Sequence, residues 1–426
     1  MTRGRWAFGL ALAALWLSGG VTPFGMALVQ AQRPNDFTPD WVAAHAWLHG
    51  GPHGAGAAAV LDGEAGNEYG LGIGAPRVFL LAAYYVHPPT AFLLLFPLVP
   101  LGFELAAVAW LIISLGLLAL LAAQLARLLD QTGTPLPAAR LFPLLIFWPP
   151  VLSNLQLGQW SILLAVTLAA SYDAWERGNH GRSAVWIATA TALKLTPILM
   201  APFLVLRDRR ALAALAVALA AWGVVSLSAG QWVAWRALFQ HTAVNVDTWQ
   251  TYMDNSLSLR GLFARLLVGG RWARAAVARP ELARGLLLAS LSVLGLIALA
   301  VTGGARDRDA DACRFAVWNV FTVVANPLAW THYAILLLLP ATLIWRAAGA
   351  APGRRGRVMA TLVTGAILIL TVPKETLYRL GGRPPVSPAR GLFISWHLLG
   401  ALMLFAAAAL GAARARRALA APEPAA

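Results

Sequence analysis

Apolar runs recur along almost the whole chain, each close to the length that crosses a lipid bilayer as a helix. A membrane-spanning helix needs about 20 consecutive apolar residues. The links between the runs carry Arg, Gly and Pro, which end and orient helices. The pattern predicts an all-α polytopic membrane protein with about twelve transmembrane helices. The expected spans are 6–30, 88–102, 104–126, 141–156, 160–176, 183–206, 211–229, 285–303, 314–326, 331–347, 358–373 and 391–412.

Composition agrees with this pattern, because 59% of the 426 residues are hydrophobic and only 12% are charged. Soluble domains carry roughly 25% charged residues, so this chain cannot cover a surface that faces only water. We therefore treat residues 1–426 as a single integral-membrane domain. Two polar stretches, 32–77 and 230–280, are expected to be loops on the outer side. The first apolar run also allows a cleaved signal peptide, because Val29-Gln30-Ala31 resembles a small-residue cleavage site.

The net charge of +15 comes almost entirely from arginine, because Lys194 and Lys374 are the only lysines. The arginines lie between apolar runs, so they indicate orientation and contact with anionic lipids, and we expect no nucleic-acid partner. Cytoplasmic clusters place both chain ends in the cytoplasm and both long loops outside. The expected location is the plasma (inner) membrane, with the active site on the outer face. The clusters lie at 3–5, 207–210, 346–357 and 414–417.

The simple count of twelve spans leaves four arginines on the outer side, against the usual preference for the cytoplasm. A second arrangement makes 88–102 re-entrant and folds 183–206 back at Pro197, which moves these arginines inside. We prefer the simple count and keep the second arrangement as the alternative. The four are Arg127, Arg140, Arg177 and Arg182.

Two carboxylates follow the first span. Asp36 comes directly after it, at the expected outer interface, where a carboxylate can accept a proton from an acceptor hydroxyl. A helix cap or a solvated loop acid is the plainer alternative. Asp40 lies one turn further on and precedes Trp41, so we interpret it as an N-terminal cap.

Lys194 lies in the otherwise apolar segment 187–200. A charge there costs a few kcal/mol unless it is paired or hydrated, which favours a functional role, with a phosphate oxyanion as the partner. The alternative is a lysine that snorkels to the membrane surface. Gln159 forms a second polar group with Asn154 and Gln156, and either binds substrate or joins neighbouring helices.

Further candidates lie in the other outer segments. His332 follows Trp330 in the link between the ninth and tenth runs, where aromatic residues suit the membrane interface. In the second outer loop, Arg260 and Arg265 follow Asn255 in an amphipathic stretch that can present arginines to lipid phosphate.

Two patterns resemble metal-binding motifs, and in both the surrounding sequence argues against a metal site. His45, His49 and His53 are spaced by four, but Gly50-Gly51-Pro52 would end a helix before His53. The acidic segment 307–311 lies in a short link among arginines, which is typical of a solvated turn. The single cysteine, Cys313, excludes a disulfide framework. We expect no metal and no cofactor.

The ordered set of motifs resembles glycosyltransferase family 87 over nearly the whole chain. The resemblance implies a GT-C fold and a polyprenyl-phosphate-sugar donor, as in the α-mannosyltransferases of phosphatidylinositol mannosides. It places the family's proposed base on Asp36 and the family's histidine on His332. His87 departs from the aromatic residue expected before Pro88-Pro89, which puts the donor or acceptor pocket in question. The motifs are Asp36-Phe37 with Trp41, Ala43, Ala44 and Gly50; Tyr85 with Pro88-Pro89; Asn154-x-Gln156-x-Gly158-Gln159; Lys194 with Pro197; Asn255-Ser256; and Asn326-Pro327 with Trp330, His332 and Tyr333.

The sequence therefore predicts a hexosyltransferase, with mannose as the candidate sugar, that uses a polyprenyl-phosphate donor, a lipid or glycan acceptor and contacts with membrane lipids. Two other functions stay open. A transporter would place polar sites at the midplane between repeated halves, and no repeat is visible. A membrane O-acyltransferase would use His332 as its base and leave Asp36 without a role. The candidate substrate-binding residues are Lys194, Asn255, Arg260, Arg265, Tyr85, Gln159 and Trp330.

Overall fold

The computed structural model is all α-helical in the parts of the chain that it describes. These parts are 36–48, 87–131, 136–229, 256–269, 273–373 and 387–413, with 232, 234–236, 238–239 and 376. The helices are α3 (Phe37–Leu48), α7 (Pro89–Phe92), η1 (Leu93–Leu101), α8 (Gly102–Asp130), α9 (Ala138–Ile146), α10 (Pro149–Leu157), α11 (Ser161–Glu176), α12 (His180–Leu193), η2 (Thr196–Met200), α13 (Ala201–Arg207), α14 (Arg209–Ser228), α16 (Leu259–Leu267), α17 (Pro280–Thr302), α18 (Arg308–Ala325), η3 (Thr331–Leu337), α19 (Leu338–Ala350), α20 (Gly353–Thr371), α22 (Pro388–Ile394) and α23 (Trp396–Ala412).

Polar residues between the apolar runs set the ends of several helices. Asp208 accepts a hydrogen bond from the N–H of Arg210 at 2.9 Å at the start of α14. Asp307 accepts one from the N–H of Ala310 at 2.8 Å at the start of α18. Such caps satisfy N–H groups that have no partner inside the helix. The acidic segment 307–311 therefore begins a helix, and the solvated turn expected there is wrong.

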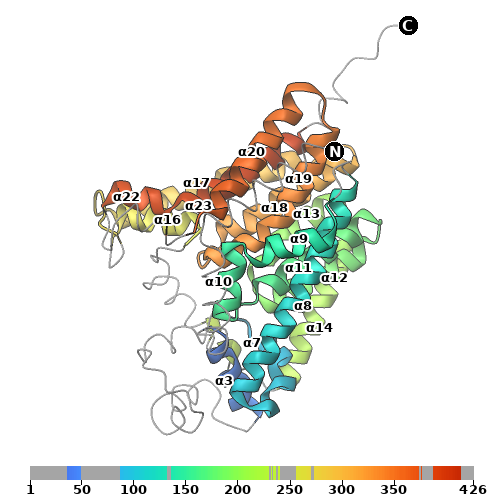
Figure 1. Cartoon of the computed structure of the whole chain (residues 1–426), viewed down its shortest axis with the longest axis vertical. Helices are drawn as coiled ribbons and strands as arrows, with labels where there is room; N and C mark the ends of the chain where they lie inside the picture. The colour runs from blue at the N-terminus through green and yellow to red at the C-terminus, as the bar shows by residue number, and fades with distance from the viewer. Residues whose placement is uncertain are drawn as a thin grey trace.

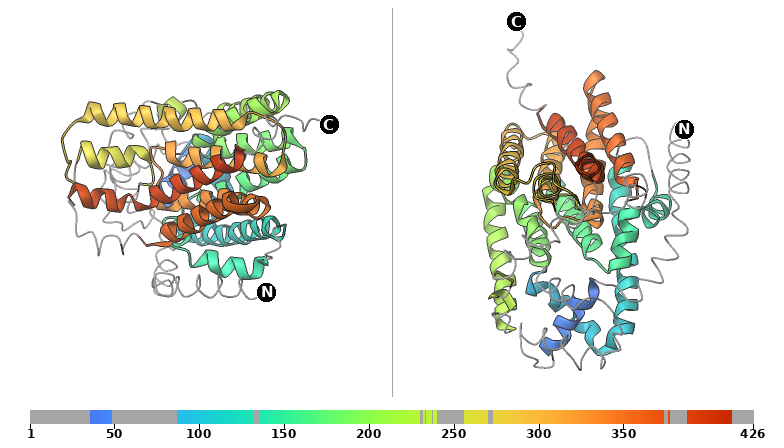
Figure 2. Two further views of the ribbon diagram at one scale, coloured as in Figure 1. Left: turned by 90° about the horizontal axis from the view of Figure 1, so that it is seen from above. Right: turned by 90° about the vertical axis from the view of Figure 1, so that its left-hand side faces the viewer.

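The core is built around α11 and α18, whose side chains are mostly buried. Figure 1 shows α18 near the centre of the molecule, while α16, α22 and the start of α17 project to one side. Seen from above in the left view of Figure 2, α16 lies between α17 and α22 and contacts both. The helix α17 is apolar but mostly exposed, as expected of a helix that faces lipid.

Four described helical segments are long and apolar enough to cross a membrane, or up to six if two bent helix pairs are each counted as one span. The twelve expected spans are therefore not all found. The first, 6–30, lies outside the described residues. The segment Pro89–Asp130 is one candidate span of 42 residues, so 88–102 is not a separate one. The bent pairs are α9 with α10, at 67°, and α22 with α23, at 54°.

The expected span 183–206 folds back on itself. The helix α12 ends at Lys194, whose backbone is extended, and the chain continues through η2 and α13. The two ends of this hairpin meet where His180 Nδ1 lies 2.6 Å from Asp208 Oδ2. A single crossing would hold these residues a full helix length apart, so the simple count of spans is wrong here. The alternative is right in one part, the fold near Pro197, whereas its re-entrant segment 88–102 stays a prediction.

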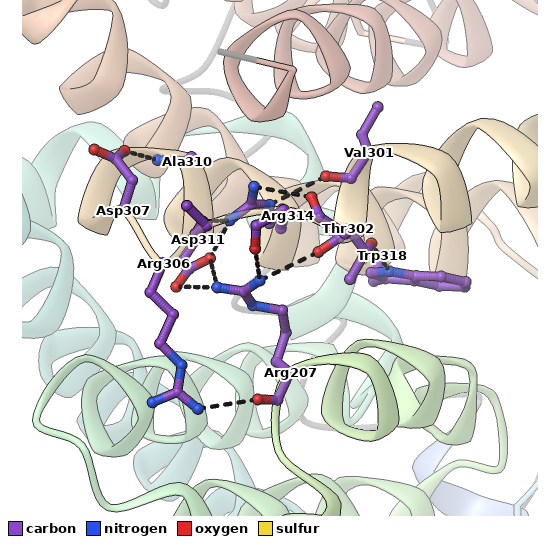
Figure 3. Close-up of polar contacts among 12 residues, drawn as sticks. Arg207, Val301, Thr302, Arg306, Asp307, Ala310, Asp311, Arg314 and Trp318 are labelled. Carbon is purple, nitrogen blue, oxygen red and sulfur yellow. Dashed lines mark hydrogen bonds and ion pairs between the residues drawn. The ribbon is translucent and has the colours of Figure 1, made fainter. Parts of the chain in front are cut away.

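The hairpin ends belong to a network of ion pairs that we call the arginine end (Figure 3). Arg207 pairs with Asp311 at 2.8 Å. Arg314 is fully buried and also pairs with Asp311, at 2.5 Å. Its remaining donors reach the carbonyl groups of Val301, Gly303 and Ala305, which lie at and just beyond the C-terminal end of α17. These carbonyls have no partner inside the helix, so Arg314 acts as a side-chain cap.

The same end contains the C-terminal ends of α8, α11 and α19. Arg346 donates to Glu176 at 2.5 Å and to Gln131 at 2.9 Å. Arg308 donates to Glu176 at 3.1 Å. Arg127 and Arg177, near the ends of α8 and α11, therefore lie on the same side as the clusters at 207–210 and 346–357. The simple count, which separated them, is wrong on this point.

Candidate active site

Asp36 stands directly before α3 and is fixed against the end of α10. Its N–H donates to the carbonyl of Leu157 at 3.0 Å. Its carboxylate accepts a hydrogen bond from Gln159 Nε2 at 2.5 Å, and only 9% of the residue is exposed. The structure therefore brings two candidate residues, Asp36 and Gln159, into direct contact.

A tight turn between α10 and α11 positions Gln159. Gly158 ends α10 with φ of 70°, in the left-handed region that glycine adopts without strain. Its carbonyl accepts a hydrogen bond from Trp110 Nε1 at 2.9 Å. The N–H of Gln159 donates to the carbonyl of Asn154 at 3.0 Å. The Asn154–Gln159 motif thus builds a rigid turn that aims one amide at Asp36.

Burial changes the acidity of Asp36. Desolvation, with a smaller contribution from the charge of Asp40, raises the pKa of its carboxyl from the usual 3.8 to about 6, although Gln159 and Lys194 oppose the shift. A carboxylate with such a pKa is still ionised at neutral pH and is a stronger base than an exposed aspartate. This is the acidity that favours a general base.

Asp40 is not the N-terminal cap that the sequence suggested. It lies inside the first turn of α3, is 1% exposed and accepts a hydrogen bond from Trp160 Nε1 at 2.7 Å. It also contacts His87 Nδ1 at 3.0 Å. A buried carboxylate needs such partners, and in this fold the neighbouring helices supply them.

His87 joins Asp40 to Lys194, since its Nε2 atom lies 2.9 Å from Lys194 Nζ. Lys194 stands at the C-terminal end of α12, where the hairpin turns, and is 5% exposed. A snorkelling lysine would expose its ammonium group, so that alternative is wrong. Its ammonium group lies 5.4 Å from the centre of the Tyr333 ring, within cation–π distance. Within the described residues, Lys194 forms no ion pair with a carboxylate.

His332 lies in η3, one residue before Tyr333. It is 1% exposed, and its ring lies 5.0 Å from the Tyr333 ring and 5.8 Å from the Trp330 ring. Trp330 Nε1 and Tyr333 Oη are buried and have no hydrogen-bond partner among the described residues. The structure therefore places His332 between Trp330 and Tyr333, whose ring also adjoins Lys194, and supplies two donors that suit sugar hydroxyls.

The two loop arginines do different things. Arg265 is buried and donates to Ser395 Oγ at 2.7 Å and to the carbonyl of Ser256 at 3.3 Å, so it ties α16 to α22. Arg260 lines a groove between α16 and α17. No described contact joins either side chain to Lys194. Tyr85 and Asn255 lie outside the described residues.

The histidine series near α3 does not assemble in the described residues. His45 packs against Trp41, with ring centres 5.1 Å apart. His49 and His53 lie outside the described residues. Among the residues that the structure describes, no three His, Cys, Asp or Glu side chains are grouped as metal ligands.

Sequence reasoning missed the connecting roles of Asp40 and His87. One signal was available: Asp36 and Asp40 are four apart, which places them on the same face of a helical turn. His87 was singled out only as a departure from a motif. Its link to Lys194 spans 107 residues of sequence, and no local pattern reveals such a contact.

Comparison with known proteins gives a consistent result. The family model described as Glycosyltransferase family 87 matches residues 85–327. The chain is 30% identical over 254 residues to the polyprenol-phosphate-mannose-dependent alpha-(1-2)-phosphatidylinositol mannoside mannosyltransferase of Mycolicibacterium smegmatis, a match that covers 56% of this chain and 52% of that protein. It thus spans about half the length of that relative.

A second relative matches over a longer stretch. It is the polyprenol-phosphate-mannose-dependent alpha-(1-2)-phosphatidylinositol pentamannoside mannosyltransferase of Mycobacterium tuberculosis, 26% identical over 388 residues. This match covers 86% of this chain and 82% of that protein. No solved structure matches the chain.

Proposed function

Because the chain belongs to glycosyltransferase family 87, we propose that it transfers a mannosyl unit from a polyprenyl-phosphate donor to a hydroxyl group of a lipid or glycan acceptor. The donor class follows the names of both relatives, which are dependent on polyprenol-phosphate-mannose. Those relatives act on phosphatidylinositol mannosides, so a lipid-linked glycan is the acceptor class to test first. The GT-C fold remains part of this proposal.

The chemistry is a single displacement. The carboxylate of Asp36 accepts the proton of the acceptor hydroxyl, and the hydroxyl oxygen attacks the anomeric carbon. The bond between that carbon and the phosphate oxygen breaks, and the polyprenyl phosphate leaves with the electron pair. The sugar is transferred with inversion. The observation that carries this assignment is the buried carboxylate of Asp36, with a pKa of about 6. It stands directly before α3, four residues from Asp40, which contacts Lys194 through His87.

Lys194 is assigned to the departing phosphate. Its ammonium carries three N–H donors and no acceptor, and His87 engages one of them. A charge-assisted hydrogen bond to a phosphate oxygen in a site without bulk water stabilises the charge that develops as the donor breaks. Arg265 is engaged by Ser256 and Ser395, so we assign it to holding α16 in place.

The remaining candidates keep their proposed roles at the periphery of this reaction. Trp330, with its buried indole N–H, is assigned to the sugar hydroxyls, and Gln159 to holding the base. His332 is assigned to the wall of the sugar pocket beside Tyr333. Arg260 is assigned to lipid phosphate at the groove between α16 and α17, and Tyr85 and Asn255 to substrate contacts.

The proposed orientation places the arginine end in the cytoplasm and Asp36, His87 and Lys194 at the outer side of the plasma membrane. The folded-back hairpin supports this, because it puts the arginines of 127–182 on the same side as the other clusters. Impermeant thiol labelling on intact cells tests it in a Cys313→Ser background. A cysteine at position 62 should react on intact cells and one at position 177 only after lysis; the reverse would refute the orientation.

Transfer is tested directly with purified protein. Radiolabelled polyprenyl-phosphate mannose and a mixed lipid extract should yield a labelled lipid product, whereas a labelled nucleotide sugar should not. Release of free mannose only, or labelling from an acyl donor instead, would contradict the proposal and favour the acyltransferase alternative. Uptake of labelled solute into proteoliposomes without covalent transfer would favour a transporter.

A further inference from the structure

A buried chain of polar contacts runs from Asp40 through His87 to Lys194. Asp40 lies 3.0 Å from His87 Nδ1, and Lys194 Nζ lies 2.9 Å from His87 Nε2. All three residues are at most 5% exposed. The three come from α3, from the residue before Pro88-Pro89, and from the break after α12. The contacts therefore join three segments of the chain that are distant in sequence.

The donors and acceptors fix the tautomer of His87. The ammonium of Lys194 can only donate, so Nε2 must accept. The Nδ1 atom then carries the proton and donates it to the Asp40 carboxylate. Burial lowers the pKa of His87, which agrees with a neutral ring. Trp160 Nε1 donates to Asp40 Oδ2 at 2.7 Å, while His87 Nδ1 lies 3.0 Å from each carboxylate oxygen, so two residues hold the carboxylate.

We propose that His87 and Asp40 are positioning residues that orient Lys194 toward the phosphate of the donor while keeping its charge available. A carboxylate in direct contact would neutralise the ammonium, as Asp311 does for the guanidinium groups at the arginine end. The imidazole holds the carboxylate one ring width away, where its attraction to the ammonium is weaker. It engages one N–H of Lys194 and leaves the others for phosphate oxygens. The inference rests on the proposed function.

The helix α3 couples this chain to the base. Asp36 and Asp40 are one helical turn apart. One rigid turn therefore sets the position of the base and, through His87, that of the phosphate-binding ammonium. A displacement of α3 would disturb both sites together, whereas loss of His87 alone would disturb only the phosphate side.

The experiment measures the affinity for polyprenyl monophosphate, from the shift of thermal unfolding in detergent, and the donor KM and kcat. In His87→Phe, the affinity should fall and the donor KM rise at least about tenfold, the size of one charge-assisted contact, with kcat changed less. His87→Gln should recover most of the loss, because its amide oxygen can accept from Lys194. Asp40→Asn is a second, independent variant and should weaken binding in the same direction. His397→Gln is the matched control, since His397 is also buried and contacts the carbonyl of Val372.

A double variant separates positioning from general structural support. If His87 acts through Lys194, His87→Phe should cost nothing further in a Lys194→Met background. Additive losses, or wild-type affinity in both His87→Phe and Asp40→Asn, would overturn the inference, as would a wild-type protein that binds no polyprenyl phosphate. If the wild type binds polyprenyl phosphate but transfers no sugar, the proposed function fails while the binding data still decide this inference.

Discussion

The arginine end and the candidate active site, which we call the site end, hold buried charges in opposite ways. At the arginine end, Arg207 and Arg314 share Asp311, and the remaining donors of Arg314 reach backbone carbonyls. At the site end, Lys194 contacts a histidine and the face of a tyrosine, and Asp36 accepts its described side-chain hydrogen bond from a neutral amide. In the first arrangement the charged groups are paired with groups of opposite charge, and in the second they are held by neutral groups.

The difference separates charges that hold the fold from the charges that we propose act on a substrate. A buried ion that is fully paired is costly to break and has little left to offer a ligand. A buried ion that is held in place by neutral groups keeps its charge and some of its donors. The pairing of a charge, as well as its burial, therefore indicates its role in this protein.

The largest expected effect is a loss of transfer activity on mutation at the site end. Asp36→Asn keeps the shape of the side chain and removes the basic carboxylate, so transfer should fall by about 10²–10⁴-fold. Donor binding should survive, because the carboxylate meets the acceptor. The assay is initial-rate transfer with donor binding measured separately. Asp173→Asn at the arginine end is the control, because Asp173 makes partly exposed ion pairs that contribute little. Near-normal transfer by Asp36→Asn would show that another group is the base.

Mutation at the arginine end should lower the stability of the fold. Arg314→Met leaves three backbone carbonyls without their donor and removes one partner of Asp311, a loss of about 3–5 kcal/mol. Thermal unfolding in detergent should show it, with donor affinity per folded molecule unchanged. Arg284→Met removes an exposed pair with Glu281 and should have almost no effect. Equal stability of the two variants would mean that the buried network does not hold the fold.

Lys194→Met sharpens the comparison, because it removes a charge and keeps a side chain of similar length. The loss of a charge-assisted contact to phosphate should weaken donor binding by about 1.5–3 kcal/mol, while the unfolding temperature changes little. Arg127→Met, which removes an exposed cation at the other end, is the matched control. An unchanged donor KM in Lys194→Met would place the phosphate elsewhere.

The smallest expected effect is a dependence on pH. The base must be ionised, and burial raises the pKa of Asp36 to about 6. Transfer should therefore be constant above that pH and fall about tenfold per unit below it, while the phosphodiester of the donor stays ionised throughout. The profile of kcat/KM is the measurement. The fall of kcat/KM at acidic pH should persist in His87→Gln. If it disappears in that variant, the titrating group is His87.

The sequence predicted the helical class and the residues with the clearest chemistry, because each rests on a local signal. Apolar runs mark helices, and an isolated Lys194 in such a run is conspicuous. The fold of 183–206 was placed wrongly in the preferred count because two short apolar helices in succession have the same hydropathy as one long helix. Asp40 was misread for a related reason: a carboxylate in a first turn is usually a cap, and only the packing of Trp160 and His87 against it gives it another role.

The length of α12 has a consequence for the depth at which the reaction takes place. Its 14 residues rise about 21 Å, less than the roughly 30 Å of the hydrocarbon layer. In the proposed orientation, which places His180 at the cytoplasmic boundary, Lys194 would lie below the opposite headgroup plane. A donor phosphate that reaches it must leave the hydrated headgroup layer and give up its water. In the proposed mechanism, the ammonium and the phosphate then offset each other's desolvation, so the protein without donor would contain half of a buried ion pair and the lipid would supply the other half.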